Sequence, residues 1–424
     1  MTKEIALVLT DPRDNRNSVT GLITALEAHD LDGRYRVRAI REEADFIRAL
    51  SEADATGKYA VGGITFLSAQ TDLARSVVSA ARAALGQSIF LVAGGPHPSG
   101  DPRGTLTMGF DAVVTGEGEI ALPELLARLE AGNGWRDTPG IACLDEGGEY
   151  RRNPRPPEAD LSSILPLSER HRRYGPIEIS RGCPFACRYC QTSSHFGTRM
   201  RHRPASLVAE GAAMLARRGM RDVRVLTPDA LAYGSTDGRE ANLPAVEDLF
   251  RLVREAAGER GRIWFGTFPS EVRPEHVTTE AMELLAKYAY NRTLVIGGQS
   301  GSEAVLAASH REHGRADIVH AARTAANAGF QPLVDMIFAL PGETDDDREQ
   351  TLELCEELLA LGARVHVHHF MPLPGSAWRD RLPEVLPPTF VKRMNRLLTE
   401  GRYFGDFREQ YKLAREAVRE KSMP

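Results

Sequence analysis

Three cysteines lie within eight residues of one another and together could hold a metal cluster. They are Cys183, Cys187 and Cys190, in the run ISRGCPFACRYC over residues 179–190. Three thiolates can bind three irons of a [4Fe–4S] cubane and leave the fourth iron open to a small molecule that chelates it. An apolar run precedes the motif directly. The thiols are therefore predicted to lie on a loop at the carboxyl end of a strand.

A structural zinc site is the alternative for the same thiols, with His195 or His202 as its fourth ligand. Zinc motifs usually pair two short cysteine knuckles, and the sequence has no second pair. The two remaining cysteines, Cys143 and Cys355, stand in apolar contexts and are predicted to be small buried side chains. The pattern favours the iron–sulfur cluster.

The composition of the chain excludes several classes of protein. Its 424 residues suggest two or three domains, and its net charge of -5 gives no basic surface for nucleic acid. An odd number of cysteines, five, is no disulfide framework. The sequence has no signal-peptide pattern and no apolar run of about 20 residues, the length that spans a bilayer. A cytoplasmic protein without a membrane partner is therefore expected.

Residues 1–150 alternate strand-like apolar runs with helix-like apolar spacing. Strands are predicted over 5–9, 35–40, 59–65, 89–95 and 112–116, and helices near 18–29, 43–53, 70–85 and 118–131. Such alternation predicts a parallel α/β sheet of the Rossmann-like (flavodoxin-like) type. Ligands of these sheets bind beyond the carboxyl ends of the strands.

A second alternating region follows a proline- and arginine-rich segment, 151–172, which is predicted to be a linker. Within 173–385, strands are predicted over 177–180, 223–227, 263–267, 293–297, 333–340 and 365–370, with helices near 204–218, 243–257, 315–328 and 345–361. Six such units predict a (β/α)6 partial TIM barrel whose chemistry lies at the carboxyl ends of its strands. Residues 386–424 are predicted to form a helical C-terminal tail.

The cysteine motif, with an aromatic residue before its last cysteine, is similar to that of the radical S-adenosylmethionine (radical SAM) superfamily. The runs TLVIGGQSGS (293–302) and VDMIFALPGET (334–344) resemble the later strands of its cobalamin-dependent members and methylthiotransferases. The runs LVAGGPHP (91–98) and DAVVTGEGE (111–119) resemble the cobalamin-binding domain fused to many of them. Methylthiotransferases carry three further cluster cysteines in their amino-terminal domain. This chain has only Cys143 there, which favours the cobalamin-dependent group.

The resemblance implies three cofactors, a [4Fe–4S] cluster on the three cysteines, S-adenosylmethionine and cobalamin. The residues it places at S-adenosylmethionine are Phe185, Tyr189, Thr227, Glu271, Gln299, Ser300 and Phe370; relatives often have Glu at the position of Gln299. Those it places at cobalamin are Asn15, Asn17, Ser18, Ser68, Thr71, Gly94, Gly95, Pro96, His97, Gly116, Glu117 and Gly118. The loop 11–20 has no histidine, so none from this loop is expected below the cobalt.

The resemblance implies a methyltransferase that acts on an unactivated sp3 carbon through a 5′-deoxyadenosyl radical and methylcobalamin. The chain is most like archaeal members that methylate the α carbon of a glutamine in methyl-coenzyme M reductase, which implies a polypeptide partner and an electron donor. The basic residues Arg199, Arg201 and Arg203 are predicted to hold the substrate, with a solvated loop as the alternative. Ring formation, small-molecule methylation and a non-catalytic corrinoid or iron–sulfur sensor remain as other functions.

Overall fold

The computed structural model describes residues 4–422 of the chain, which divide into two compact units. The first unit comprises the residues up to Gly175 together with Ser194–Phe196. The second comprises Pro176–Ser193 and the residues from Gly197 onward. Within the described part of the chain, no helix is both long and apolar enough to cross a membrane.

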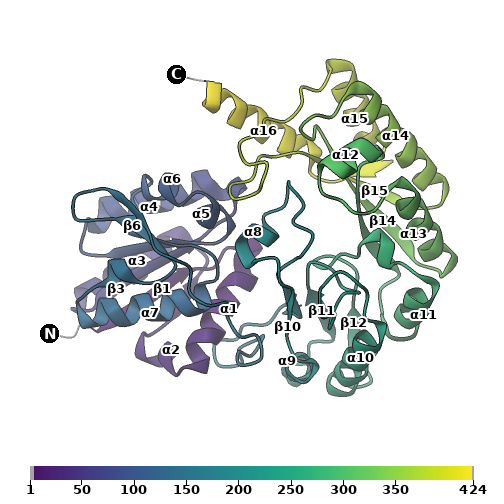
Figure 1. Ribbon diagram of the computed structural model, residues 1–424. Coiled ribbons are helices and arrows are strands. Elements are labelled where there is room, and N and C mark those ends of the chain that lie inside the picture. The colour runs from purple at the N-terminus through teal and green to yellow at the C-terminus, as the bar shows by residue number, and fades with distance from the viewer. Residues whose placement is uncertain (1–3, 423–424) are drawn as a thin grey trace. The chain divides into compact units, whose positions relative to one another are not determined.

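The first unit is built on a seven-stranded sheet with the order β2-β1-β3-β4-β5-β6-β7 (Figure 1). Its strands are β1 Ile5–Thr10, β2 Arg38–Ile40, β3 Tyr59–Thr65, β4 Phe90–Gly94, β5 Ala112–Val114, β6 Ile141–Leu144 and β7 Tyr150–Arg152. The first five are parallel, as the sequence predicted, and the fold class is confirmed. The antiparallel strands β6 and β7 were not predicted.

Helices cover both faces of this sheet, because its strands are apolar on both sides. The helices are α1 Arg16–Ala28, α2 Leu31–Arg34, α3 Glu43–Ala55, α4 Thr71–Leu85, α5 Pro96–Gly100, α6 Pro102–Leu106 and α7 Gly118–Ala131. One core packs α1 and α7 on the sheet, and a second packs α3 and α4 on the opposite face. From β1 the chain continues to β2 on one side of the sheet and then crosses to β3 on the other side, so the direction of strand order changes between β1 and β3. A ligand is therefore expected beyond the carboxyl ends of these two strands.

The second unit is a partial barrel of parallel strands. The strands are β8 Ile177–Glu178, β11 Asp222–Leu226, β12 Arg262–Trp264, β13 Thr293–Gln299, β14 Gln331–Phe338, β15 Arg364–His369 and β16 Tyr403–Phe404. They form the orders β12-β11-β8 and β13-β14-β15-β16, and a parallel bridge between Val272 and Ile296 joins the two sets. The predicted six-stranded partial barrel is confirmed. The pairing of β16 with β15 was not predicted.

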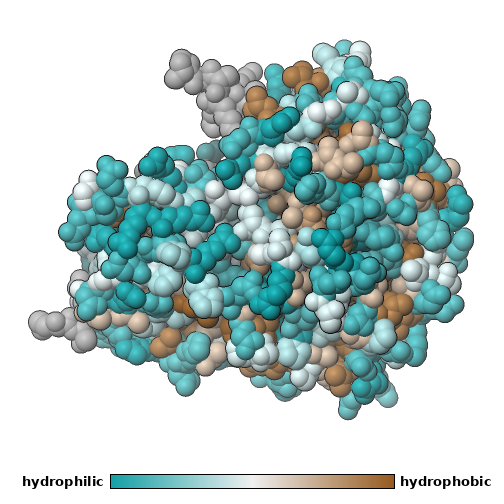
Figure 2. Space-filling view, viewed as in Figure 1, coloured by the Kyte–Doolittle hydropathy of each residue, from teal (hydrophilic) through white to brown (hydrophobic). Residues whose placement is uncertain are grey.

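The helices of the second unit follow its strands around the barrel (Figure 1). They are α9 Ala205–Arg217, α10 Leu243–Ala257, α11 Thr279–Tyr288, α12 Glu303–Ala308, α13 Arg315–Asn327 and α14 Asp345–Ala360, then α15 Pro388–Thr399 and α16 Phe407–Ser422 in the tail. A short helix α8, Thr192–Phe196, and a ribbon of β9 Ser180–Arg181 with β10 Arg201–His202 follow the first strand. The surface shown in Figure 2 is mostly hydrophilic, with apolar residues in small scattered groups.

Residues between β7 and the barrel pack within the first unit. Ser168 donates a hydrogen bond to Glu27 at 2.6 Å, and His171 lies 2.7 Å from the buried carboxylate of Asp32. Next to them, Arg173 reaches Asp11 with two hydrogen bonds of 2.6 Å between buried groups. Two residues near the end of the stretch predicted to be a linker, Ser168 and His171, are thus held by polar contacts to α1 and α2.

Candidate functional site

The backbone around the three clustered cysteines forms a tight loop directly after β9. Gly182 has a φ of +88°, and a Cβ there would lie 2.2 Å from the carbonyl oxygen of Arg199, so only glycine fits. The backbone N–H of Cys183 donates to the Gly197 carbonyl at 3.2 Å. The N–H of Cys190 donates to the Cys187 carbonyl at 3.0 Å. These bonds close the loop and fix where its thiols lie.

The three thiols fit a [4Fe–4S] cluster in type and number. Burial raises the pKa of Cys183 to about 11, and the nearby thiols of Cys190 and Cys187 add to this shift. N–H donors of the kind that stabilise cluster thiolates are present: the Thr192 N–H lies 3.4 Å from Cys190 Sγ and Arg311 Nη1 lies 3.6 Å from Cys187 Sγ. Both ring nitrogens of His202 already contact Ser180 and the Ser235 carbonyl, which disfavours His202 as a zinc ligand.

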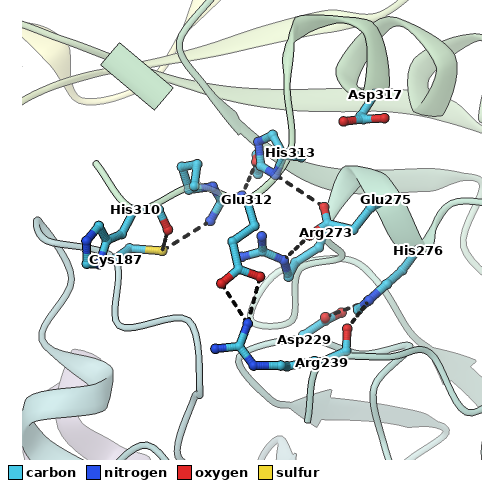
Figure 3. Close-up of polar contacts among 12 residues, drawn as sticks. Cys187, Asp229, Arg239, Arg273, Glu275, His276, His310, Glu312, His313 and Asp317 are labelled. Atoms are coloured by element: carbon cyan, nitrogen blue, oxygen red, sulfur yellow. Dashed lines mark hydrogen bonds and ion pairs between the residues drawn. The ribbon is translucent and has the colours of Figure 1, made fainter. Parts of the chain in front are cut away.

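A charged segment, residues 309–313, lies along the cysteine loop and was not predicted (Figure 3). The Ser309 carbonyl accepts the N–H of Arg188 at 3.1 Å, and the His310 carbonyl lies 3.9 Å from Cys187 Sγ. Arg311 reaches Cys187, the hydroxyl of Tyr189 at 3.4 Å, and the carbonyl of Gly297. This guanidinium therefore links the cluster loop to the end of β13. Its only sequence signal is the run HREH, which is typical of solvated surface.

The aromatic ring of Phe185 lies against two arginines. The guanidinium carbon of Arg273 is 3.4 Å from the ring centroid and that of Arg239 is 5.2 Å away. Arg273 also binds Glu275 at 2.5 Å, and Glu275 lies 3.2 Å from His313 (Figure 3). Cation–π contact and ion pairs thus hold the buried Phe185 from a neighbouring loop. The structure gives Phe185 a packing role within the cluster loop.

An ion pair between Asp229 and His276 lies in the interior of the barrel. His276 Nδ1 is 2.8 Å from Asp229 Oδ2, and its Nε2 is 2.7 Å from the Arg239 carbonyl (Figure 3). Burial lowers the pKa of His276, but its contacts with Asp229 and the Arg239 carbonyl and the charge of Glu275 together outweigh burial, and the net shift is upward. Both ring nitrogens lie against oxygen atoms, which favours the charged form of this histidine.

Three polar side chains surround the backbone of Gly297. A Cβ at Gly297 would lie 3.0 Å from Gln299 Nε2, 3.2 Å from Arg311 Nη2 and 3.5 Å from Glu271 Oε2. Gln299 adopts a φ of +77° at an irregularity of β13. Burial raises the pKa of Glu271 to about 7, and the carboxylate of Asp335 adds to this rise. Of the residues predicted to meet S-adenosylmethionine, Glu271 and Gln299 are brought together here.

The other predicted S-adenosylmethionine residues lie nearby in different roles. Tyr189 and Phe370 belong to one apolar cluster, in which Phe370 packs edge-to-face on Trp378 at 5.9 Å. The Thr227 hydroxyl donates to the Asp229 carbonyl at 3.1 Å. The Ser300 hydroxyl is buried and lies 3.1 Å from Thr351 Oγ1 of α14. The Ser300 side chain thus ties β13 to a helix.

The three arginines predicted to hold the substrate lie in different environments. Arg199 is exposed, whereas Arg201 lies in β10 and is largely buried. Arg203 is 3% exposed, donates to the Glu178 carbonyl at 2.9 Å and lies 3.9 Å from the Glu178 carboxylate. Arg203 therefore contributes to the first strand of the barrel.

The carboxyl ends of β1, β3 and β4 bring several predicted cobalamin residues together. Asn15 donates to the Thr65 carbonyl at 2.9 Å, and Ser68 Oγ lies 3.1 Å from His97 Nδ1. A Cβ at Gly94 would meet nothing within 4 Å, so open space borders this glycine. The hydroxyl of Thr65 is buried and has no hydrogen-bond partner in the described structure. An unpaired donor beside an open glycine edge fits a polar cofactor.

The remaining predicted cobalamin residues shape the same edge. Asn17 and Ser18 start α1, Thr71 donates to the Ser68 carbonyl at 2.8 Å, and Pro96 starts α5. Gly95 has a φ of +101°. The N–H of Gly116 donates to Ser99 at 3.0 Å, and Glu117 accepts the N–H of Ala159 at 3.0 Å. A Cβ at Gly118 would lie 2.6 Å from Leu22, so Gly118 serves the packing of α7 on α1.

Comparison with known proteins finds a family match within each of the two units. Residues 177–355 match the radical SAM superfamily, and residues 22–126 match the B12 binding domain. An uncharacterized protein of Methanopyrus kandleri is 27% identical over 79% of this chain and 70% of its own length. An uncharacterized methyltransferase of Pyrococcus horikoshii is 26% identical over 65% of this chain, which spans 59% of that relative.

A solved structure shares the fold of both units. It is that of the radical S-adenosylmethionine methyltransferase TsrM from Kitasatospora setae with cobalamin and a [4Fe–4S] cluster bound. Its TM-score is 0.70 at 18% identity, over 88% of this chain and 74% of that one. The predicted cofactors, a [4Fe–4S] cluster, S-adenosylmethionine and cobalamin, are those that the two matched domains imply. The predicted enzyme class, a radical SAM methyltransferase, agrees with the radical SAM match and with the methyltransferase relative of Pyrococcus horikoshii.

Proposed function

Because the chain combines a radical SAM domain with a B12-binding domain, we propose that it is a C-methyltransferase that methylates an unactivated sp3 carbon. The observation that carries this is the set of three thiols beside Arg311, which also contacts Gly297, in a chain that also carries the open Gly94 edge. When bound, the cluster and S-adenosylmethionine supply a 5′-deoxyadenosyl radical, and cobalamin supplies the methyl group.

The residues of the barrel bind and orient what reacts there. Cys183, Cys187 and Cys190 hold the cluster. Around Gly297, Arg311 offers a fixed positive charge to a carboxylate, while Glu271 and Gln299 offer acceptors to amino and hydroxyl groups. The apolar cluster that contains Phe370 and Trp378 excludes water from the same region. Exclusion of water protects a reactive radical from side reactions.

For the substrate, we propose the α carbon of a glutamine in a polypeptide of the methyl-coenzyme M reductase type. Sequence likeness to the archaeal enzymes that carry out this methylation supports it. The exposed guanidinium of Arg199, a few residues after the cluster motif, offers a contact for an acidic or amide-rich peptide. An external electron donor reduces the cluster in this scheme.

The experiment is an anaerobic turnover with reconstituted cluster, S-adenosylmethionine, cobalamin, reductant and a glutamine-containing peptide of methyl-coenzyme M reductase, read by mass spectrometry. We expect a gain of one methylene mass, with 5′-deoxyadenosine and S-adenosylhomocysteine both formed. The same peptide with alanine in place of glutamine is the control and stays unmethylated. Formation of 5′-deoxyadenosine without a methylated peptide would overturn the proposed substrate. Absence of both 5′-deoxyadenosine and methylated peptide would favour a non-catalytic sensor.

A further inference from the structure

We propose that Asp335, His366 and His368 form a binding site for one divalent first-row transition-metal ion, separate from the cysteine loop. The three side chains come from neighbouring strands, since Asp335 of β14 is paired in register with His366 of β15. His366 and His368 are two residues apart on one strand and therefore share a face of the sheet. Their ligand atoms all lie within 4.8 Å of one another.

The donor atoms converge closely on one point. Asp335 Oδ1 is 2.7 Å from His366 Nδ1, and His368 Nε2 is 3.2 Å from the same nitrogen. Which atom donates at each of these contacts depends on the tautomers of the two imidazoles. A metal ion would instead take one lone pair from each donor. Ligands at about 2.1 Å from an ion lie within about 4 Å of one another, so little movement is needed.

Neighbouring groups hold both imidazoles in place, as groups around metal-binding histidines do. The ring of Phe404 stacks on His366 at 4.6 Å with an angle of 8°. A Cβ at Gly405, where φ is +121°, would lie 2.4 Å from His366 Cδ2, so the backbone of Gly405 packs directly against this ring. The side-chain amide of Gln410 donates to His368 Nδ1 at 3.2 Å, because its oxygen accepts the N–H of His369 at 2.8 Å. Binding of an ion through His368 Nε2 therefore requires this amide to turn, so that Nδ1 carries the ring proton. The tail thus orients the site.

The surrounding charge also favours a cation. The Asp335 side chain is 10% exposed, and its carboxylate acts electrostatically on that of Glu271. Two carboxylates in a poorly solvated interior repel each other, which a divalent ion relieves. Two imidazoles and one carboxylate suit Fe²⁺, Mn²⁺, Co²⁺ or Zn²⁺ and leave coordination positions open. The role of the ion rests on the proposed function: an open position can hold the carbonyl oxygen next to the methylated carbon.

The test uses the full chain with its cluster reconstituted in the diamagnetic oxidised state and without cobalamin. Co²⁺ is titrated in and measured by equilibrium dialysis and by its high-spin EPR signal. We expect one Co²⁺ per chain, and at least about ten-fold weaker binding in Asp335→Asn and His368→Gln, because each loses one ligand. His320→Gln, an exposed histidine on α13, is the matched control and keeps full binding.

Two results would overturn the site: no stoichiometric Co²⁺ in the parent protein, or unchanged binding in both variants. Melting temperatures measured without metal show whether a variant has lost its fold, and the two substitutions serve as independent checks. A crystal of the Co²⁺ complex, with anomalous scattering at the cobalt edge, must place the ion at His366. If the protein binds Co²⁺ at this site but transfers no methyl group, the metal site is supported and the proposed activity is contradicted.

Discussion

The guanidinium of Arg311 lies 3.6 Å from the sulfur of Cys187 and also contacts the hydroxyl of Tyr189 and the carbonyl of Gly297. It is a fixed positive charge that touches both a cluster ligand and the backbone of Gly297. Reduction adds negative charge to the cluster, and a nearby cation stabilises that charge. We therefore expect Arg311 to influence both the reduction potential and the binding of S-adenosylmethionine.

Substitution Arg311→Gln is expected to make the reduction potential of the cluster more negative by roughly 60 mV, which for one electron corresponds to about 1.4 kcal/mol. The measurement is an EPR-monitored redox titration. Arg311→Lys keeps the charge and should recover part of the shift. Arg323→Gln, an exposed arginine on α13, is the control. An unchanged potential in Arg311→Gln, at full iron content, would contradict this role.

Removal of a cluster ligand is expected to abolish formation of 5′-deoxyadenosine. Cys183→Ala, Cys187→Ala and Cys190→Ala should each lose most of the bound iron after reconstitution, because two thiolates hold a cubane poorly. Cys143→Ala, in the buried core of the first unit, is the matched control and keeps its iron. Iron content and absorbance near the thiolate-to-iron band measure the difference. Equal iron in all four variants would contradict the assignment.

Substitutions at two adjacent glycines, Gly94 and Gly95, are expected to affect different properties, cobalamin binding and folding stability. A Cβ at Gly94 meets no atom within 4 Å, whereas one at Gly95 would lie 2.8 Å from Thr65 Oγ1, at a φ of +101°. Gly94→Ala should leave the melting temperature of the cobalamin-free protein unchanged and weaken cobalamin binding by about ten-fold or more. Gly95→Ala should cost about 1–2 kcal/mol of stability even without cofactor. Cobalamin titrations and thermal unfolding measure the pair; unweakened binding in Gly94→Ala would argue against this edge.

The buried carboxyl group of Glu343 gives stability a defined pH dependence. Burial raises its pKa from 4.5 to about 8. Between these pH values the folded protein therefore binds more protons than the unfolded chain. The contribution of Glu343 to the free energy of unfolding thus falls as pH rises from about 4.5 to 8. Above pH 8 the loss is complete and amounts to about 5 kcal/mol, since one pKa unit corresponds to about 1.4 kcal/mol.

Glu343→Gln should remove this pH dependence of the free energy of unfolding, because the amide does not titrate. The fold should persist, since the amide oxygen can still accept the N–H of Ala339 as Glu343 Oε2 does at 2.6 Å. Urea unfolding at several pH values between 4 and 9 measures it. Glu349→Gln, an exposed carboxylate on α14, the helix that begins two residues after Glu343, serves for comparison and keeps the parent pH dependence. Parallel pH profiles for Glu343→Gln and the parent protein would refute the prediction.

Most of the fold could be predicted from the sequence, because parallel strands buried on both faces are near-continuous apolar runs. The strands β1 and β3 are of this kind. Two short strands were not predicted, because residues far along the chain decide their pairing. β16 has two residues, and β7, Tyr150–Arg152, is polar on one side. Nothing local in either stretch indicates a strand.

The candidate site was predictable where spacing alone carries the chemistry, as in the cysteine loop. It was not predictable where burial gives a charged residue its role. Arg311 and His276 stand in charged runs typical of solvated surface, and only packing places them inside. Arg203 shows the same effect in reverse, since the basic run was predicted to meet substrate and the structure puts this arginine against Glu178.

The pairing of β16 with β15 makes the C-terminal segment a part of the barrel's inner wall. Phe404, Gly405 and Gln410 touch the imidazoles of His366 and His368 from the far end of the chain. A shortened version of the protein that stops before Tyr403 would retain every helix and strand of the partial barrel up to β15 and yet lose the contacts that β16 and α16 make with those two rings. Versions trimmed or fused at this end would thus change the surroundings of His366 and His368 while the strands that carry them remain.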